Sequence, residues 1–75
     1  MASDILMTLG NRIRERRKIL NLTQEELAAK ADIDRSYIGG VERGERNVTF
    51  IMLCNICVAL ECDVAALTNG LPGML

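Results

Sequence analysis

Histidine and tryptophan are absent from this 75-residue chain, and phenylalanine, tyrosine and proline each occur once. Without histidine, and with no nucleophile-base pair or phosphate-cradling glycine loop, the sequence gives no support to an enzyme. The scarcity of aromatic side chains and β-branched runs argues against a sheet. We therefore predict a small all-α domain with a core of Leu, Ile, Val, Ala and Met.

The three cysteines Cys54, Cys57 and Cys62 cannot pair evenly, and no histidine is present to complete a zinc site. We interpret them as reduced thiols that act as small apolar side chains, which is typical of cytoplasmic proteins. An alternative is a thiol switch, because Cys54 and Cys57 are one helical turn apart. No metal, cofactor or small-molecule ligand is expected.

The apolar stretch 48–60 is too short to cross a bilayer, and we recognise no secretory signal. A cytoplasmic protein without a membrane partner is therefore expected. The formal net charge is -1, but all nine basic residues lie between Arg12 and Arg46, whereas the rest of the chain carries only acidic residues. A charged, locally basic first half thus precedes an apolar second half.

Apolar residues spaced by three, four and seven positions predict a first helix from about residue 5 to residue 20, with Gly10 as its weak point. Thr23 and Glu26 form a capping box that begins a second helix. Asp32 and Asp34 predict a tight turn, with Asp34 or its neighbour as the cap of a third helix over 35–42.

Gly44 is predicted to end the third helix. Thr49 then caps a fourth helix that runs to about residue 60, and Asp63 caps a short fifth helix that ends near residue 69. Two short helices joined by a three-residue turn are typical of a helix-turn-helix unit, here over 23–43 within a single domain 1–75. Its apolar or small positions are Leu27, Ala28, Ala31, Ile33, Ile38 and Val41.

Segment 22–31, LTQEELAAKA, together with Ile33, Tyr37-Ile38 and Glu42-Arg-Gly44, resembles the lambda-repressor-like (XRE or Cro/repressor) helix-turn-helix family. Segment 34–49, DRSYIGGVERGERNVT, is more narrowly similar to the controller proteins of restriction-modification systems. The resemblance covers about residues 9–68 and implies a five-helix all-α DNA-binding fold. Asp32 stands where many relatives have glycine, but aspartate tolerates a left-handed backbone better than most residues.

In a helix-turn-helix protein, the second helix of the unit presents its N-terminal turn to base edges in the major groove. Arg35 is therefore the candidate for a bidentate contact with guanine, and Gln24 is expected to bind phosphate or to brace Arg35. The residues that we expect to contact double-stranded DNA are Arg17, Gln24, Arg35, Ser36, Tyr37, Arg43, Arg46 and Asn47. Alternatively, Arg35 pairs with Asp34 or Glu42, and the arginines of the first helix form a solvated face.

The predicted fourth helix has one polar residue in eleven. Five of its side chains are expected to cluster toward the core, namely Phe50, Leu53, Ile56, Cys57 and Leu60. Because the opposite side is also apolar, it must be buried against another surface. We predict a homodimer formed by helices 49–69, with Ile51, Met52, Asn55 and Val58 at the two-fold axis. Its half-site centres would lie about 34 Å apart on DNA.

Together, these features predict a homodimeric transcription regulator that binds inverted-repeat operators. The resemblance to controller proteins implies control of restriction-modification genes, with activation at one occupancy and repression at another, and RNA polymerase as a further partner. Two alternatives remain: a phage or plasmid repressor, and an antitoxin-like interaction module whose fourth helix binds a different protein.

Overall fold

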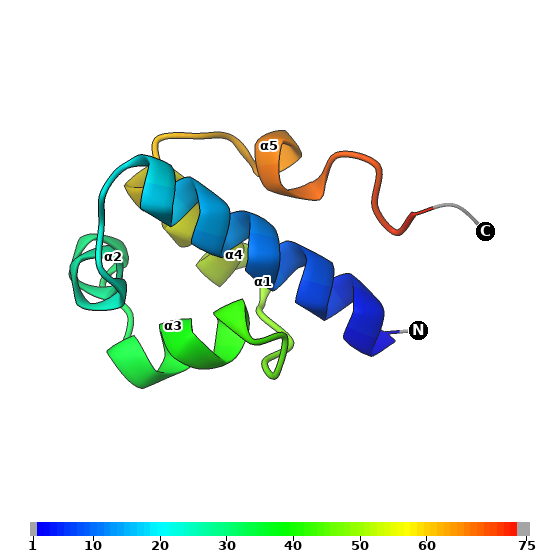
Figure 1. Ribbon diagram of the computed structural model, residues 1–75, viewed down its shortest axis with the longest axis horizontal. Helices are drawn as coiled ribbons and strands as arrows, with labels where there is room; N and C mark the ends of the chain where they lie inside the picture. The colour runs from blue at the N-terminus through cyan, green and yellow to red at the C-terminus, as the bar shows by residue number, and fades with distance from the viewer. Residues whose placement is uncertain (1, 74–75) are drawn as a thin grey trace.

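The computed structural model describes residues 2–73, which form five helices and no strand. In chain order they are α1 (Ala2–Ile19), α2 (Gln24–Ala31), α3 (Arg35–Glu42), α4 (Phe50–Ala59) and α5 (Val64–Thr68). The long α1 crosses the middle of the molecule, with α3 on one side and α5 on the other (Figure 1). The predicted all-α, five-helix architecture is confirmed, although α1 begins about three residues earlier than expected.

No helix within residues 2–73 has the length and apolar character needed to cross a bilayer.

The last four helices each begin at the predicted N-cap. The hydroxyl of Thr23 accepts a hydrogen bond from the Glu26 amide at 3.0 Å, and the Glu26 carboxylate accepts one from the Thr23 amide at 2.8 Å. Asp34, Thr49 and Asp63 likewise accept from amides in the first turns of α3, α4 and α5. These bonds satisfy amides that a helix leaves without partners, and therefore fix where each helix begins.

Two backbone positions set how the helices meet. Asp32 has φ 57°, the left-handed conformation expected at the turn between α2 and α3. Gly10 lies where α1 crosses α3, and a Cβ atom there would be only 2.4 Å from the Val41 carbonyl oxygen. The glycine that weakens α1 as a helix is thus required for the close approach of α3.

The core includes the inward residues predicted for α2 and α3, such as Leu27, Ile38 and Val41, and those of α4 from Leu53 onward. Phe50 is the exception, because its side chain is 66% exposed. The prediction that Phe50 packs in the core is therefore wrong. Phe50 lies about 90° around the helix from the centre of the buried face and in the first turn, so it borders the outer surface.

Candidate nucleic-acid interface

The first turn of α3 is held by Asp34. The Asp34 carboxylate accepts a hydrogen bond from the backbone amide of Ser36 at 3.2 Å and another from the Ser36 hydroxyl. The hydroxyl bond is the main reason that the pKa of Asp34 lies below its ordinary value, and the nearby Arg35 charge adds a smaller effect. Ser36 is exposed, but its hydroxyl is engaged by the cap.

Arg35 is exposed in that same first turn. Within the described part of the chain it has neither a hydrogen-bond partner nor an ion-pair partner. The alternative in which Arg35 forms a direct bond with Asp34 or Glu42 is therefore not what the structure shows. Its guanidinium keeps all of its donors available for an external acceptor, and five donors in a planar fork fit the paired acceptors of guanine or a phosphate.

Tyr37 and Arg46 form a stacked pair beside this turn. The guanidinium carbon of Arg46 lies 5.2 Å from the centroid of the half-buried Tyr37 ring, which is the distance of a cation–π contact. The stem of Arg46 passes over Gly40, where a Cβ would lie 3.0 Å from the arginine Cγ. Arg46, in the loop after α3, is therefore folded back over α3.

Arg43 and Asn47 lie in the same exposed loop. The Arg43 Nε lies 3.1 Å from the Glu45 carboxylate, and both side chains are largely exposed. The Arg43 Nη1 also comes within 3.1 Å of the place where a Gly39 side chain would begin. The loop 43–47 thus presents polar donors next to the outer surface of α3.

Glu42, at the last position of α3, is buried and connects three helices. Its carboxylate accepts two bonds from Arg17 of α1, at 2.7 and 3.0 Å, and one from the side-chain amide of Gln24 of α2, at 3.1 Å. Arg17 also donates to the carbonyl of Leu22 at 2.8 Å, and its pKa is raised mainly by the bond to Glu42. These contacts compensate the cost of burying the carboxylate and hold α3 against α1 and α2.

Two of the residues that we expect to contact DNA, Arg17 and Gln24, are bonded to Glu42 in this network. The side chain of Arg17 is only 12% exposed and points inward to Glu42, unlike the exposed Arg35. Gln24 braces Glu42 rather than Arg35. Sequence reasoning missed the network, although one signal was available: an acidic residue at a helix C-terminus opposes the helix dipole and needs a cationic partner.

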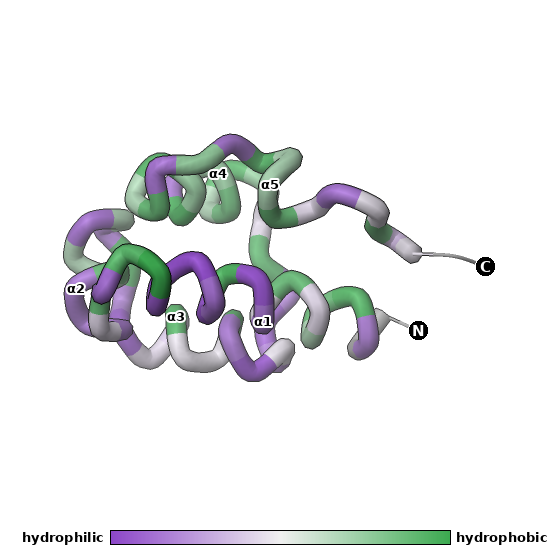
Figure 2. The backbone as a smooth tube through the Cα atoms, turned by 45° about the horizontal axis from the view of Figure 1, so that its top comes forward, coloured by the Kyte–Doolittle hydropathy of each residue, from purple (hydrophilic) through white to green (hydrophobic). Residues whose placement is uncertain are grey.

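The outer surface of α4 is apolar and uncovered. Phe50, Ile51 and Val58 are 66%, 69% and 78% exposed, Asn55 is exposed and Met52 is half-buried. Figure 2 shows α4 largely in the green of hydrophobic residues, whereas α1 alternates between green and purple. So concentrated an apolar surface on a small domain is typical of an interaction site.

Two of the three cysteines lie on α4, and Cys62 follows it. Cys57 is buried, and Cys54 and Cys62 are half-buried, all as free thiols. Burial, together with neighbouring Cys62, raises the pKa of Cys57 to about 12, so its thiol stays protonated at neutral pH. Among residues 2–73, no group of side chains is arranged to hold a metal ion.

The family model for a helix-turn-helix domain matches residues 13–67, which span the C-terminal part of α1, all of α2, α3 and α4, and α5 up to Leu67. The chain belongs to the helix-turn-helix family. Control protein C.SmaI of Serratia marcescens is 45% identical over 64 residues, which cover 85% of this chain and 76% of that protein.

Two solved structures of helix-turn-helix proteins extend this similarity. The restriction-modification controller protein C.AhdI from Aeromonas hydrophila has a TM-score of 0.82 at 44% identity, covering 83% of this chain and 94% of that one. The controller protein C.Esp1396I, solved as a tetramer in complex with its natural 35-base-pair operator, has a TM-score of 0.75 at 39% identity, covering 79% and 78%. The predicted resemblance to controller proteins is thus confirmed.

Within the helix-turn-helix family, the first helix of the unit crosses the DNA backbone and the second enters the major groove. In this chain those helices are α2 and α3. The exposed Arg35 therefore lies in the first turn of the second of these helices.

Proposed function

We propose that this chain is a sequence-specific DNA-binding transcription regulator that acts as a homodimer on inverted-repeat operators of restriction-modification genes. The observation that carries the proposal is the exposed guanidinium of Arg35, which has no bonded partner among residues 2–73, on a helix whose opposite end is fixed by the buried Glu42. A donor that is free while its helix is held is suited to reading a base. The similarity to controller proteins supports the same assignment.

The side chains around Arg35 divide into two roles. Arg35 would bind guanine, with Ser36 and Tyr37 against neighbouring bases or phosphates. The remaining proposed contacts would fix the register of the protein on the duplex through phosphates or the adjacent minor groove; they are Gln24, Arg43, Arg46 and Asn47. Arg17 would act indirectly, by holding Glu42 at the end of α3 in place.

The dimer would form through the outer surface of α4, with Ile51, Met52, Asn55 and Val58 near the two-fold axis. The exposure of Ile51 and Val58 supports this proposal, because burying these side chains removes apolar area from water. Two Asn55 side chains could then hydrogen-bond across the axis and fix the register. One domain 1–75 would thus combine the reading unit 23–43 with the dimerisation helices 49–69.

Regulation would follow from occupancy of the operator. Controller C.Esp1396I binds its operator as a tetramer, and by analogy successive dimers of this chain would activate and then repress transcription, with RNA polymerase as the partner in activation. This step rests on the relatives rather than on a contact within the chain.

A mobility-shift titration tests the proposal. Duplexes from upstream of the neighbouring restriction-modification genes are compared with shuffled duplexes at several salt concentrations. We expect the operator to bind at least about 10³-fold more tightly than shuffled DNA, with affinity falling as salt rises. Equal affinity for both duplexes would refute sequence-specific recognition. Co-purification with a different protein in place of a homodimer would instead favour an interaction module.

A further inference from the structure

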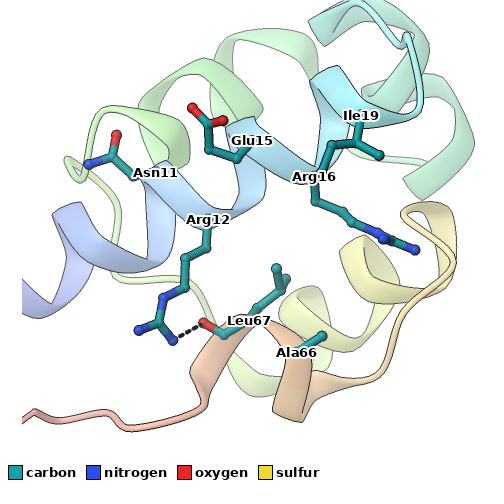
Figure 3. A pocket seen from close by; sticks show the side chains of 7 residues that line it. All are labelled: Asn11, Arg12, Glu15, Arg16, Ile19, Ala66 and Leu67. Carbon is teal, nitrogen blue, oxygen red and sulfur yellow. Dashed lines mark hydrogen bonds between the residues drawn. The ribbon is translucent and has the colours of Figure 1, made fainter.

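A groove of about 340 Å³ separates α1 from α5. Its walls include Ile19, Ala66 and Leu67 and the stems of Arg12 and Arg16 (Figure 3). Leu67 of α5 is buried in the core beside this groove, but along the open stretch the space between the two helices is not filled by side chains. Contacts that cross the open stretch therefore add to the packing that sets the separation of α1 and α5.

Arg12 spans this gap to the end of α5, and Arg16 reaches from α1 to the end of α4; together they make four hydrogen bonds to backbone carbonyls. Arg12 Nη1 donates to the carbonyl oxygen of Leu67 at 3.1 Å and to that of Asn69 at 2.7 Å, at the end of α5. Arg16 donates through Nε to the Leu60 oxygen and through Nη2 to the Glu61 oxygen, each at 3.0 Å, at the end of α4.

The chemistry of these contacts is specific to arginine at a helix C-terminus. The last carbonyls of a helix have no partner within the helix and carry the negative end of its dipole. A guanidinium supplies both a positive charge and several donors in a fixed plane, so one side chain can bind two carbonyls in a defined orientation. Arg12 and Arg16 therefore fix the ends of both helices relative to α1.

Helix α1 is in turn fixed to α3, which we call the recognition helix because it is the helix proposed to enter the major groove. Gly10 lets its backbone touch the end of α3, and Arg17 binds the buried carboxylate of Glu42. A continuous path of contacts thus runs from α3 through α1 to the ends of α4 and α5. The outer surface of α4 lies at the other end of this path.

We propose that Arg12 and Arg16 are positioning residues that set the separation of the two recognition helices, and hence the half-site spacing that the dimer accepts. This inference rests on the proposed function, because it requires a dimer formed through α4. Neither arginine needs to contact DNA for this role. Their bonds transmit the position of the dimer axis to α3.

The test compares operators in which the two half-sites keep their natural spacing or are separated by one additional base pair. That insertion rotates one half-site by about 35° and moves it by about 3.4 Å. For the wild-type protein, it should weaken binding at least about tenfold, the scale of one lost base contact. We call the dissociation constant on the lengthened operator, divided by that on the natural operator, the spacing ratio. For the Arg12→Ala/Arg16→Ala variant, the spacing ratio should fall to about threefold or less, because the recognition helices can shift.

Arg14→Ala is the matched control. Within residues 2–73, the Arg14 side chain bonds only to Asn11 on the same helix, so its removal should keep the wild-type spacing ratio. An unchanged ratio in the Arg12→Ala/Arg16→Ala variant would overturn the inference, as would an equal drop in the control.

If the alanine variant does not fold, the spacing ratio is measured on Arg12→Lys/Arg16→Lys, because lysine keeps the charge but lacks the planar fork. A ratio below the wild-type value supports the inference, and an unchanged ratio overturns it. Failure of the proposed function would be distinguishable, because the wild-type protein would then show no preference for the operator at any spacing.

Discussion

The first turn of α3 and the outer surface of α4 are both exposed, but the two helices are held in different ways. On α3, Asp34 fixes the first turn, Arg46 stacks on Tyr37, and Glu42 binds the last turn to two other helices. On α4, the exposed side chains are mostly apolar, as at Ile51 and Val58. Directional bonds suit a surface that must place donors within a fraction of an ångström, whereas burial of apolar area is sufficient for association.

Removing the carboxylate of Glu42 should have the largest effect, because it leaves the nearly buried Arg17 guanidinium without its counter-charge. We expect Glu42→Ala to lower the free energy of unfolding by about 3–5 kcal/mol, measured by urea denaturation. Glu45→Ala is the control, because its pair with Arg43 is largely exposed. That variant should lose less than about 1 kcal/mol. Equal losses in the two variants would show that the buried pair does not brace α3.

Val58→Asp tests the apolar outer surface of α4. A charge on each side of the proposed two-fold axis should raise the dimer dissociation constant at least about 30-fold, as expected when a central interface residue is lost. Sedimentation velocity measures the change, and circular dichroism should show that the exposed position tolerates it. Ala29→Asp introduces the same charge at an exposed site on α2. A dimer that survives Val58→Asp as well as it survives Ala29→Asp would place the interface elsewhere.

Arg35→Ala tests the reading surface directly. Loss of a bidentate base contact should cost about 1–3 kcal/mol on the operator and much less on shuffled DNA. Arg43→Ala, in contrast, should weaken binding to both duplexes alike and reduce the salt dependence, because we assign it to phosphate. Fluorescence anisotropy over a salt series separates the two effects. If Arg35→Ala lowered both affinities equally, its assigned role would be wrong.

The stacking of Arg46 on Tyr37 should have a smaller effect. A double-mutant cycle with Tyr37→Leu and Arg46→Ala should give a coupling energy of about 0.5–1 kcal/mol in the stability of the free protein. Additive losses would mean that the stacked geometry is not maintained in solution.

The buried thiol should have the smallest effect on both surfaces. Because the pKa of Cys57 is raised to about 12, its thiol should resist iodoacetamide at pH 8 in the folded protein, as followed by mass spectrometry. Replacement of Cys54 and Cys57 by alanine should leave DNA affinity unchanged. Rapid labelling of Cys57, or redox-dependent DNA binding, would instead support a thiol switch.

The starts of α2, α3, α4 and α5 could be predicted from the sequence because the signals that set them are local. Thr23, Asp34, Thr49 and Asp63 each accept a bond from an amide only two or three residues away, so short segments contain the information. Phe50 shows the limit of helical periodicity. At the border of a face, the tertiary neighbours decide whether a side chain is covered, and periodicity alone placed Phe50 in the core incorrectly.

The roles of the arginines in α1 could not be predicted because their partners are distant in the chain. Arg17 and Glu42 are 25 residues apart, and Arg12 and Asn69 are 57 residues apart. A basic face on a helix gives the same sequence pattern whether it binds phosphates, buried carboxylates or helix ends. The exposed position of Arg35, in contrast, follows from its place just after a helix cap, which is again a local feature.

Hydroxyl-radical footprinting of the wild-type protein on its operator tests the central claim most directly. Two copies of α3 joined through α4 should protect two patches on one face of the duplex, with centres about 34 Å apart, or roughly one helical turn. A single protected patch, or two patches at a separation unrelated to the helical repeat, would contradict the account.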